Sequence, residues 1–285
     1  MGLAFGLAAA VSWGLADYGA AIASRRVGSM RVVLGFHVIA TVLLVLVVLA
    51  AGELGRLADA DPLDFVLLGA VGCGSYLAFY RALAIGPISV VSPIVSGYAA
   101  VTVVLAVVLL GDRPSLGATI AIVVAMLGVV LASSDVAQIR RQHRAPLAGI
   151  GLALLAMALL GGFVFGVADQ SEDLGWLVPV FLARACTTIF LLLVGARAGE
   201  LDLPDRSPRL LGTIALLGVL DTAGYAAFNL GVRHADTSIV AAASAPYAVI
   251  PIVMGVAVLH ERPAWVQWLG VGLVLGGLVL LGLFA

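Results

Sequence analysis

The chain has 285 residues, of which 62% are hydrophobic and only 11% are charged. Soluble proteins carry about 25% charged residues, so this composition, with a mean hydropathy of +1.17, excludes an ordinary soluble domain. The net charge is −1 and no basic patch or tail is present, which excludes a nucleic-acid partner.

Apolar runs of around twenty residues recur along the whole chain, and each is long enough to cross a hydrocarbon core of about 30 Å. The connections between them are short, so no soluble domain of useful size fits between two runs. We therefore predict an all-α integral membrane protein, a multi-pass protein of the plasma membrane whose immediate partner is the lipid bilayer. Its ten transmembrane helices lie at approximately 2–22, 31–51, 63–84, 88–110, 115–133, 147–168, 176–196, 210–232, 237–259 and 264–284.

The first predicted helix carries Trp13 and Asp17 one turn apart, so the two side chains share a face. A carboxylate inside a membrane helix is costly unless it faces water or a partner. Trp13 has two interpretations, a packing or interfacial residue and a wall of an internal cavity, and the sequence leaves both open.

The third and fourth predicted helices are interrupted. The stretch from 78 to 101, AFYRALAIGPISVVSPIVSGYAAV, contains Arg81, Pro87, Pro93 and the tyrosines Tyr80 and Tyr98. Each unpaired backbone group in hydrocarbon costs several kcal/mol, so these breaks are expected to face another helix or a wet cavity. The alternative is that glycine and proline are simply commoner in membrane helices.

The chain contains an internal repeat. Residues 76–114 align with 225–263 without a gap, and 12 of 39 positions are identical, where chance gives roughly four. A weaker match joins GLAD (14–17) to GVAD (166–169). We predict two five-helix repeats, 1–135 and 147–285, joined by a loop at 136–146. Because five is odd, the two copies must be inverted in the membrane, as in secondary transporters.

Polar and aromatic side chains form matching stripes on the third and eighth helices. Asp221, Tyr225 and Asn229 follow each other at i, i+4 and i+8, and their counterparts 149 residues earlier are Gly72, Tyr76 and Tyr80. We expect the two stripes to line a cavity between the repeats, with Tyr98 and Tyr247 beside it. The alternative is aromatic packing between helices.

Two charges lie at similar depth near the middle of neighbouring helices, Arg184 and Asp221, and His37 occupies the place in the second helix that matches Arg184. A charge there costs at least about 2.5–3.5 kcal/mol, so each needs a partner or water. Two hypotheses remain open: a structural ion pair between the helices, or a cavity carboxylate that binds a substrate ammonium or relays a proton.

Two segments resemble the EamA domains of the drug/metabolite transporter superfamily. They are AFYRALAIGPISVVSP followed by LLGDRPSLGATIAIVVAMLGVVL, and the later run ending HERPAWVQWLGVGLVLGGLVLL. The acidic-Arg-Pro turn with Asp112 and Glu261 matches the family's acidic turn, although Asp112 replaces the commoner glutamate. The resemblance implies a ten-helix carrier of small organic molecules, often an exporter of amino acids, other metabolites or toxic compounds.

We therefore predict a secondary transporter that works by alternating access, with protons as a candidate coupling ion. A passive channel and an intramembrane enzyme are the rival classes. No HExxH motif or pair of histidines with metal-ligand spacing is present, so we expect no enzyme activity, cofactor or metal. The predicted substrate-binding residues are Trp13, Asp17, Tyr76, Tyr80, Tyr98, Arg184, Asp221, Tyr225, Asn229 and Tyr247.

Overall fold

The chain is mostly helical in the part that the computed structural model describes, which is residues 1–85, 91, 94–133, 147–202, 207–250, 253 and 264–284. Seven of its helices contain a stretch long and apolar enough to cross a membrane. They are α1 (Gly2–Val27), α2 (Ser29–Ala51), α3 (Pro62–Ile85), α8 (Leu147–Leu174), α9 (Leu177–Ala198), α10 (Pro208–Val232) and α13 (Trp265–Phe284). An all-α integral membrane fold follows.

The remaining described helices are shorter. Two apolar stretches, Ile94–Leu110 and Leu116–Ala132, fall below the length of the other seven. The helices are η1 (Glu53–Asp59), α5 (Tyr98–Leu105), a π-helical turn η2 (Ala106–Leu110), α6 (Leu116–Ser133), α11 (Thr237–Ser244) and η3 (Ala245–Ala248). The loop predicted at 136–146, the beginning of the span predicted at 88–110 and most of the later part of the span at 237–259 lie outside the described residues.

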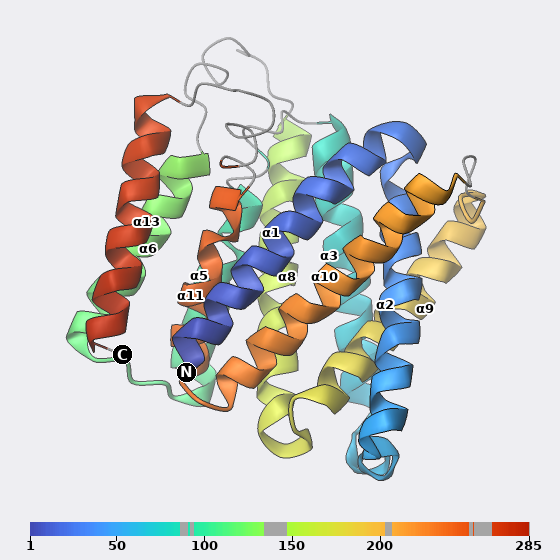
Figure 1. The fold of residues 1–285 in the computed structure, drawn as a ribbon, viewed down its shortest axis with the longest axis horizontal. Coiled ribbons are helices and arrows are strands. Elements are labelled where there is room, and N and C mark those ends of the chain that lie inside the picture. Colours follow the sequence, from blue (N-terminus) through green and yellow to red (C-terminus); the bar gives the residue numbers. More distant parts are fainter. Residues whose placement is uncertain are drawn as a thin grey trace.

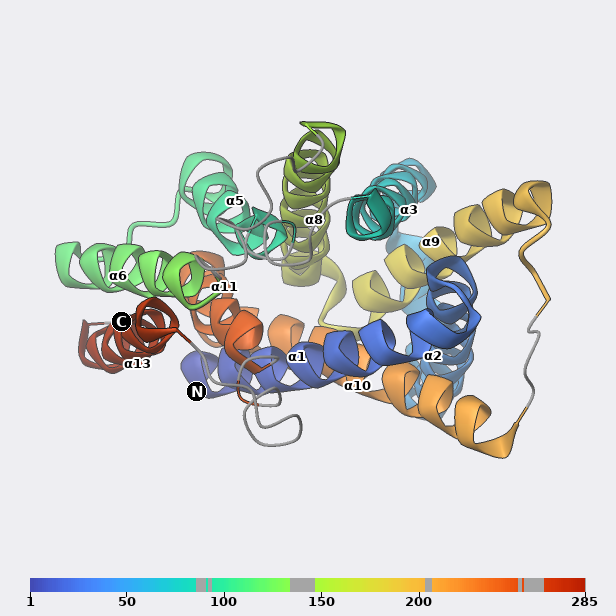
Figure 2. The same ribbon diagram turned by 90° about the horizontal axis from the view of Figure 1, so that it is seen from above.

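Helices from the two halves of the chain pack against each other in corresponding pairs. α1 packs against α10 as α8 packs against α3, α2 against α10 as α9 against α3, and α11 against α1 as α5 against α8. α6 and α13 form a pair of their own at one end of the molecule, and α2 and α9 lie toward the opposite end (Figures 1 and 2). The core between these ends is therefore shared by both halves.

The glycines at helix ends reveal the register of the repeat. Gly28 and Gly175 have φ of 91° and 74°, and Gly52 and Gly199, which end α2 and α9, have φ of 70° and 68°. Glycine is favoured at such left-handed positions because it has no Cβ to clash. The members of each pair are 147 residues apart. The first two helices of each repeat therefore align at an offset of 147 residues, whereas residues 76–114 and 225–263 align at 149.

This register corrects the match between GLAD and GVAD. A Cβ on Gly14 would lie 2.8 Å from the Tyr247 carbonyl oxygen, and one on Gly161 would lie 2.8 Å from the Tyr98 carbonyl oxygen. Gly14 therefore corresponds to Gly161 and not to Gly166, and Asp17 corresponds to Val164 and not to Asp169. The offset between the repeats changes from 147 to 149 because two more residues separate the second and third helices in the second repeat than in the first, and the match of GLAD with GVAD, 152 residues apart, fits neither offset.

The acidic turn of the first repeat stabilises a helix of the second. The Asp112 carboxylate accepts a hydrogen bond of 2.8 Å from the backbone N–H of Ser238 in the first turn of α11. Asp236, the residue before that helix, makes no capping hydrogen bond with its own side chain. Asp112 thus supplies the cap that satisfies one of the free N–H groups. Glu261, the acidic residue predicted for the second turn, lies outside the described residues.

Asp236 gives a pH-dependent prediction. Partial burial and the neighbouring Asp112 carboxylate raise the pKa of Asp236 above its ordinary value. A raised carboxyl pKa in the folded state means that ionisation destabilises the protein, and that this penalty disappears as the pH falls through the folded pKa. We expect Asp236→Asn to raise the melting temperature at neutral pH, with the gain shrinking on acidification. Thermal unfolding from about pH 7.5 to about pH 4.5 tests this, and a gain that grew at low pH would contradict it.

Candidate functional site

A cavity lies between the two halves of the chain. Its walls come from α1, α2, α3, α5, α8, α10 and η3. Seven of the ten residues predicted from the sequence line it: Trp13, Asp17, Tyr76, Tyr98, Asp221, Tyr225 and Tyr247.

Aromatic rings form a continuous cluster on this cavity. The ring centroids of Trp13 and Tyr225 are 4.9 Å apart in an edge-to-face arrangement, and those of Tyr98 and Tyr247 are 5.5 Å apart. Trp13 also meets Tyr98 edge to face at 6.4 Å, which joins the two pairs. Trp13 therefore packs between helices and also forms part of the cavity wall, so the two interpretations do not exclude each other.

Opposite walls of the cavity differ in charge. Asp17 on α1 and Asp221 on α10 contribute carboxylates from two helices that pack together. Leu160 and Val164 on α8 also line the cavity, and they correspond to Trp13 and Asp17 because they lie 147 residues later in the chain. The repeat thus builds a symmetric frame around an asymmetric site, with acidic groups on one side and apolar groups on the other.

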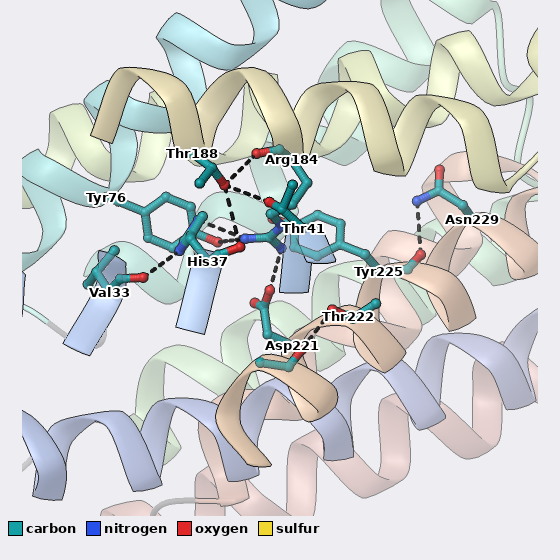
Figure 3. A network of polar contacts seen from close by, with 11 residues as sticks. Val33, His37, Thr41, Tyr76, Arg184, Thr188, Asp221, Thr222, Tyr225 and Asn229 are labelled. Carbon is teal, nitrogen blue, oxygen red and sulfur yellow. Dashed lines mark hydrogen bonds and ion pairs between the residues drawn. The ribbon is translucent and has the colours of Figure 1, made fainter. Parts of the chain in front are cut away.

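Arg184 lies behind the cavity wall and pairs with Asp221. Its guanidinium forms an ion pair with the Asp221 carboxylate, lies 4.8 Å from the centroid of the Tyr225 ring, and is 3.5 Å from the Tyr76 hydroxyl oxygen. Arg184 is only 2% exposed and is absent from the cavity lining. The predicted pairing of Arg184 with Asp221 is confirmed (Figure 3). Asp221 also lines the cavity.

His37 completes the partners of Arg184. The Nδ1 atom of His37 is 2.9 Å from the Val33 carbonyl oxygen, which can only accept a hydrogen bond, so Nδ1 carries the proton. The Nε2 atom then accepts a hydrogen bond of 2.7 Å from Arg184 Nη1. A neutral histidine thus serves as an acceptor for a buried cation, which removes one unpaired donor without adding a second positive charge.

Two threonines extend this network and were not predicted. The hydroxyl oxygens of Thr41 and Thr188 are 2.8 Å apart, and Thr188 also donates to the Arg184 carbonyl oxygen at 2.8 Å. Thr41 and Thr188 are 147 residues apart, as are His37 and Arg184. Corresponding residues of two repeats contact each other only at the symmetry axis between the repeats. An alignment of the repeats at an offset of 147 residues would therefore have predicted these contacts.

Two predicted cavity residues lie elsewhere. Asn229 is 1% exposed, donates to the Tyr225 carbonyl oxygen at 2.9 Å and accepts a hydrogen bond of 2.7 Å from Ser171 on α8. Tyr80 lines a second cavity together with Tyr76 and Arg81. On α10 the residues that line the first cavity are Leu217, Asp221 and Tyr225, so Asn229 lies one turn beyond them. On α3 Tyr76 lines both cavities, and Tyr80, one turn later, lines the second.

The chain matches the EamA-like transporter family over residues 1–134 and 147–283. The chain belongs to this family. The two matched segments are the two halves whose helices pack in corresponding pairs, so the EamA two-repeat architecture applies to the whole chain. The chain is accordingly a multi-pass membrane protein of a family of transporters of the drug/metabolite type, whose members are not enzymes.

A solved structure shares the overall fold of this chain. This structure, titled "Crystal structure of protein", superposes with a TM-score of 0.79 and 16% sequence identity, covering 100% of this chain and 97% of that one. No curated protein matches the chain. Within the described residues no group of three His, Cys, Asp or Glu side chains is placed to hold a metal ion.

Proposed function

We propose that this EamA protein is a secondary transporter that exports small organic molecules, such as amino acids, other metabolites or toxic compounds, by alternating access to the cavity between its halves. The observation that carries this proposal is the cavity itself, which is built from both repeats and is lined by aromatic and acidic side chains. Substrate sites of transporters with repeats lie at such interfaces.

The same proposal includes ten membrane crossings arranged as two inverted repeats. The beginning of α6 lies beside the end of α13, because Ser115 donates a hydrogen bond of 3.0 Å to the Phe284 carbonyl oxygen. The beginning of α13 lies beside the end of α6, since a Cβ on Gly270 would lie 2.0 Å from the Ala132 nitrogen. These corresponding helices are antiparallel, as inversion requires. The two chain ends also lie at the same end of the molecule (Figure 1).

We assign the seven residues on the cavity wall to substrate binding. Tyr80, Arg184 and Asn229, which the sequence placed in the same group, are assigned supporting positions. Arg184 holds Asp221 and the ring of Tyr225 in place, and Asn229 joins α8 to α10. Protons remain the candidate coupling ion, because a cavity carboxylate can exchange a proton with either side in turn.

Flux measurements in sealed proteoliposomes test the proposal. The purified protein is reconstituted, and uptake of labelled amino acids and amines is followed with and without unlabelled solute trapped inside. We expect uptake that saturates with concentration and is accelerated by trapped solute. Flux that neither saturates nor shows counterflow would support a channel, and chemical conversion of the solute would support an enzyme; either result contradicts the proposal.

A further inference from the structure

We infer that the cavity selects an organic molecule with one positive charge, an aromatic or apolar body and no carboxylate. The inference rests on the proposed transport function and narrows its substrate class. It begins with the charges on the wall: among the described residues that line the cavity, Asp17 and Asp221 are the charged side chains, and none is basic.

Only one of these two carboxylates is neutralised. Asp221 forms an ion pair with Arg184. Asp17 makes no hydrogen bond or ion pair with any residue that the structure describes, and it is half-buried on the cavity wall. A carboxylate in a low-dielectric site attracts a cation strongly because little water screens it. Asp17 therefore leaves the cavity with one negative charge that a monovalent cation can balance.

The uncharged part of the wall also suits a cation with an apolar body. The faces of tryptophan and tyrosine rings attract cations, by about 0.5–2 kcal/mol each. Trp13 lies on the same helix as Asp17, one turn before it, and is joined by ring contacts to Tyr98 and Tyr225. Across the cavity, Leu160 and Val164 offer an apolar surface to the remainder of the molecule.

A carboxylate on the substrate would find no partner. Among the described residues, Arg184 is the basic residue that contacts the cavity wall, and its guanidinium is occupied by Asp221, His37 and the ring of Tyr225. It is also covered by the wall, since it is 2% exposed. Leaving a buried charge unpaired costs several kcal/mol, so amino acids with a free carboxylate are expected to bind less well than the corresponding amines.

The test compares three probes with the same phenyl body: 2-phenylethylamine, phenylalanine and 3-phenylpropionate, which carry a positive charge, both charges and a negative charge at neutral pH. Affinities are measured by calorimetric titration of the purified, unmodified protein. We expect the amine to bind at least about tenfold more tightly than either of the others, which corresponds to about 1.4 kcal/mol. Phenylalanine or phenylpropionate binding as tightly as the amine, or no binding of the amine, would overturn the inference.

Variants identify the residue responsible. Asp17→Asn should weaken amine binding by about tenfold or more without weakening the binding of 3-phenylpropionate, which has no ammonium group. Asp173→Asn, which removes an exposed carboxylate at the end of α8, should change neither. Unchanged amine binding by Asp17→Asn would also refute the inference; if that variant does not fold, the probe series on the unmodified protein decides. Counterflow of phenylalanine with no preference for the amine would refute the substrate class alone, whereas unsaturable leak would refute the transport function.

Discussion

Replacing Asp221 by asparagine is expected to lower the free energy of unfolding by about 3–5 kcal/mol, the usual cost of removing one partner from a buried ion pair. The variant keeps the shape of the side chain but leaves the Arg184 guanidinium, 2% exposed, without a counter-charge. His37 can accept only one hydrogen bond from Arg184, and a tyrosine ring compensates only part of a full charge. The measurement is the unfolding of purified protein by heat or denaturant.

The double variant Asp221→Asn with Arg184→Gln separates a structural pair from a binding carboxylate. Removing both charges should restore part of the lost stability, because a neutral pair carries no desolvation penalty for an unpaired ion. Asp173→Asn, at an exposed position, should leave stability unchanged within about 0.5 kcal/mol. A normally folded Asp221→Asn protein that had lost transport would show that the carboxylate acts on substrate or protons rather than as a structural partner.

Replacing Gly270 by alanine is expected to destabilise the protein by about 1–3 kcal/mol or more through overpacking. The added Cβ would lie 2.0 Å from the Ala132 nitrogen and 2.6 Å from its Cα. Both are backbone atoms of α6, so no side chain can rotate to make room, and α6 and α13 must separate. Small residues permit this close approach. Membrane helices associate through the van der Waals packing that it gives, because lipid provides no hydrophobic driving force between them.

The same helix provides the control. A Cβ on Gly276 would meet nothing within 4 Å, so Gly276→Ala is expected to be neutral or to stabilise the helix by up to about 1 kcal/mol. The two substitutions are chemically identical and lie less than two turns apart on α13. Equal effects on the melting temperature would show that close packing against α6 does not hold this pair together.

The sequence alone determined the class of the protein and its repetition. Hydrophobic composition and run length depend on no tertiary detail, because a lipid environment requires about twenty apolar residues for each crossing. The ungapped match of 76–114 with 225–263 was equally independent of structure. Arg184 and Asp221 were predicted as partners because two charges at similar depth have few other ways to avoid the cost of burial.

The register of the first helix and the membership of the site were decided only by the tertiary structure. Gly52 and Gly69 are two residues closer in sequence than Gly199 and Gly218, the corresponding pair in the second repeat. A search at one fixed offset therefore misses the correspondence of Asp17 with Val164. Spacing along a helix predicts a shared face but does not predict where the cavity ends along that face. Asp221 and Tyr225 line the cavity, and Asn229, one turn further along α10, does not. Which of the two cavity carboxylates has no charged partner also depends on packing, because a partner can come from any of the neighbouring helices. The sequence predicted Arg184 as the partner of Asp221 and named no partner for Asp17, and the structure places Asp17 on the cavity wall without a hydrogen bond or ion pair among the described residues.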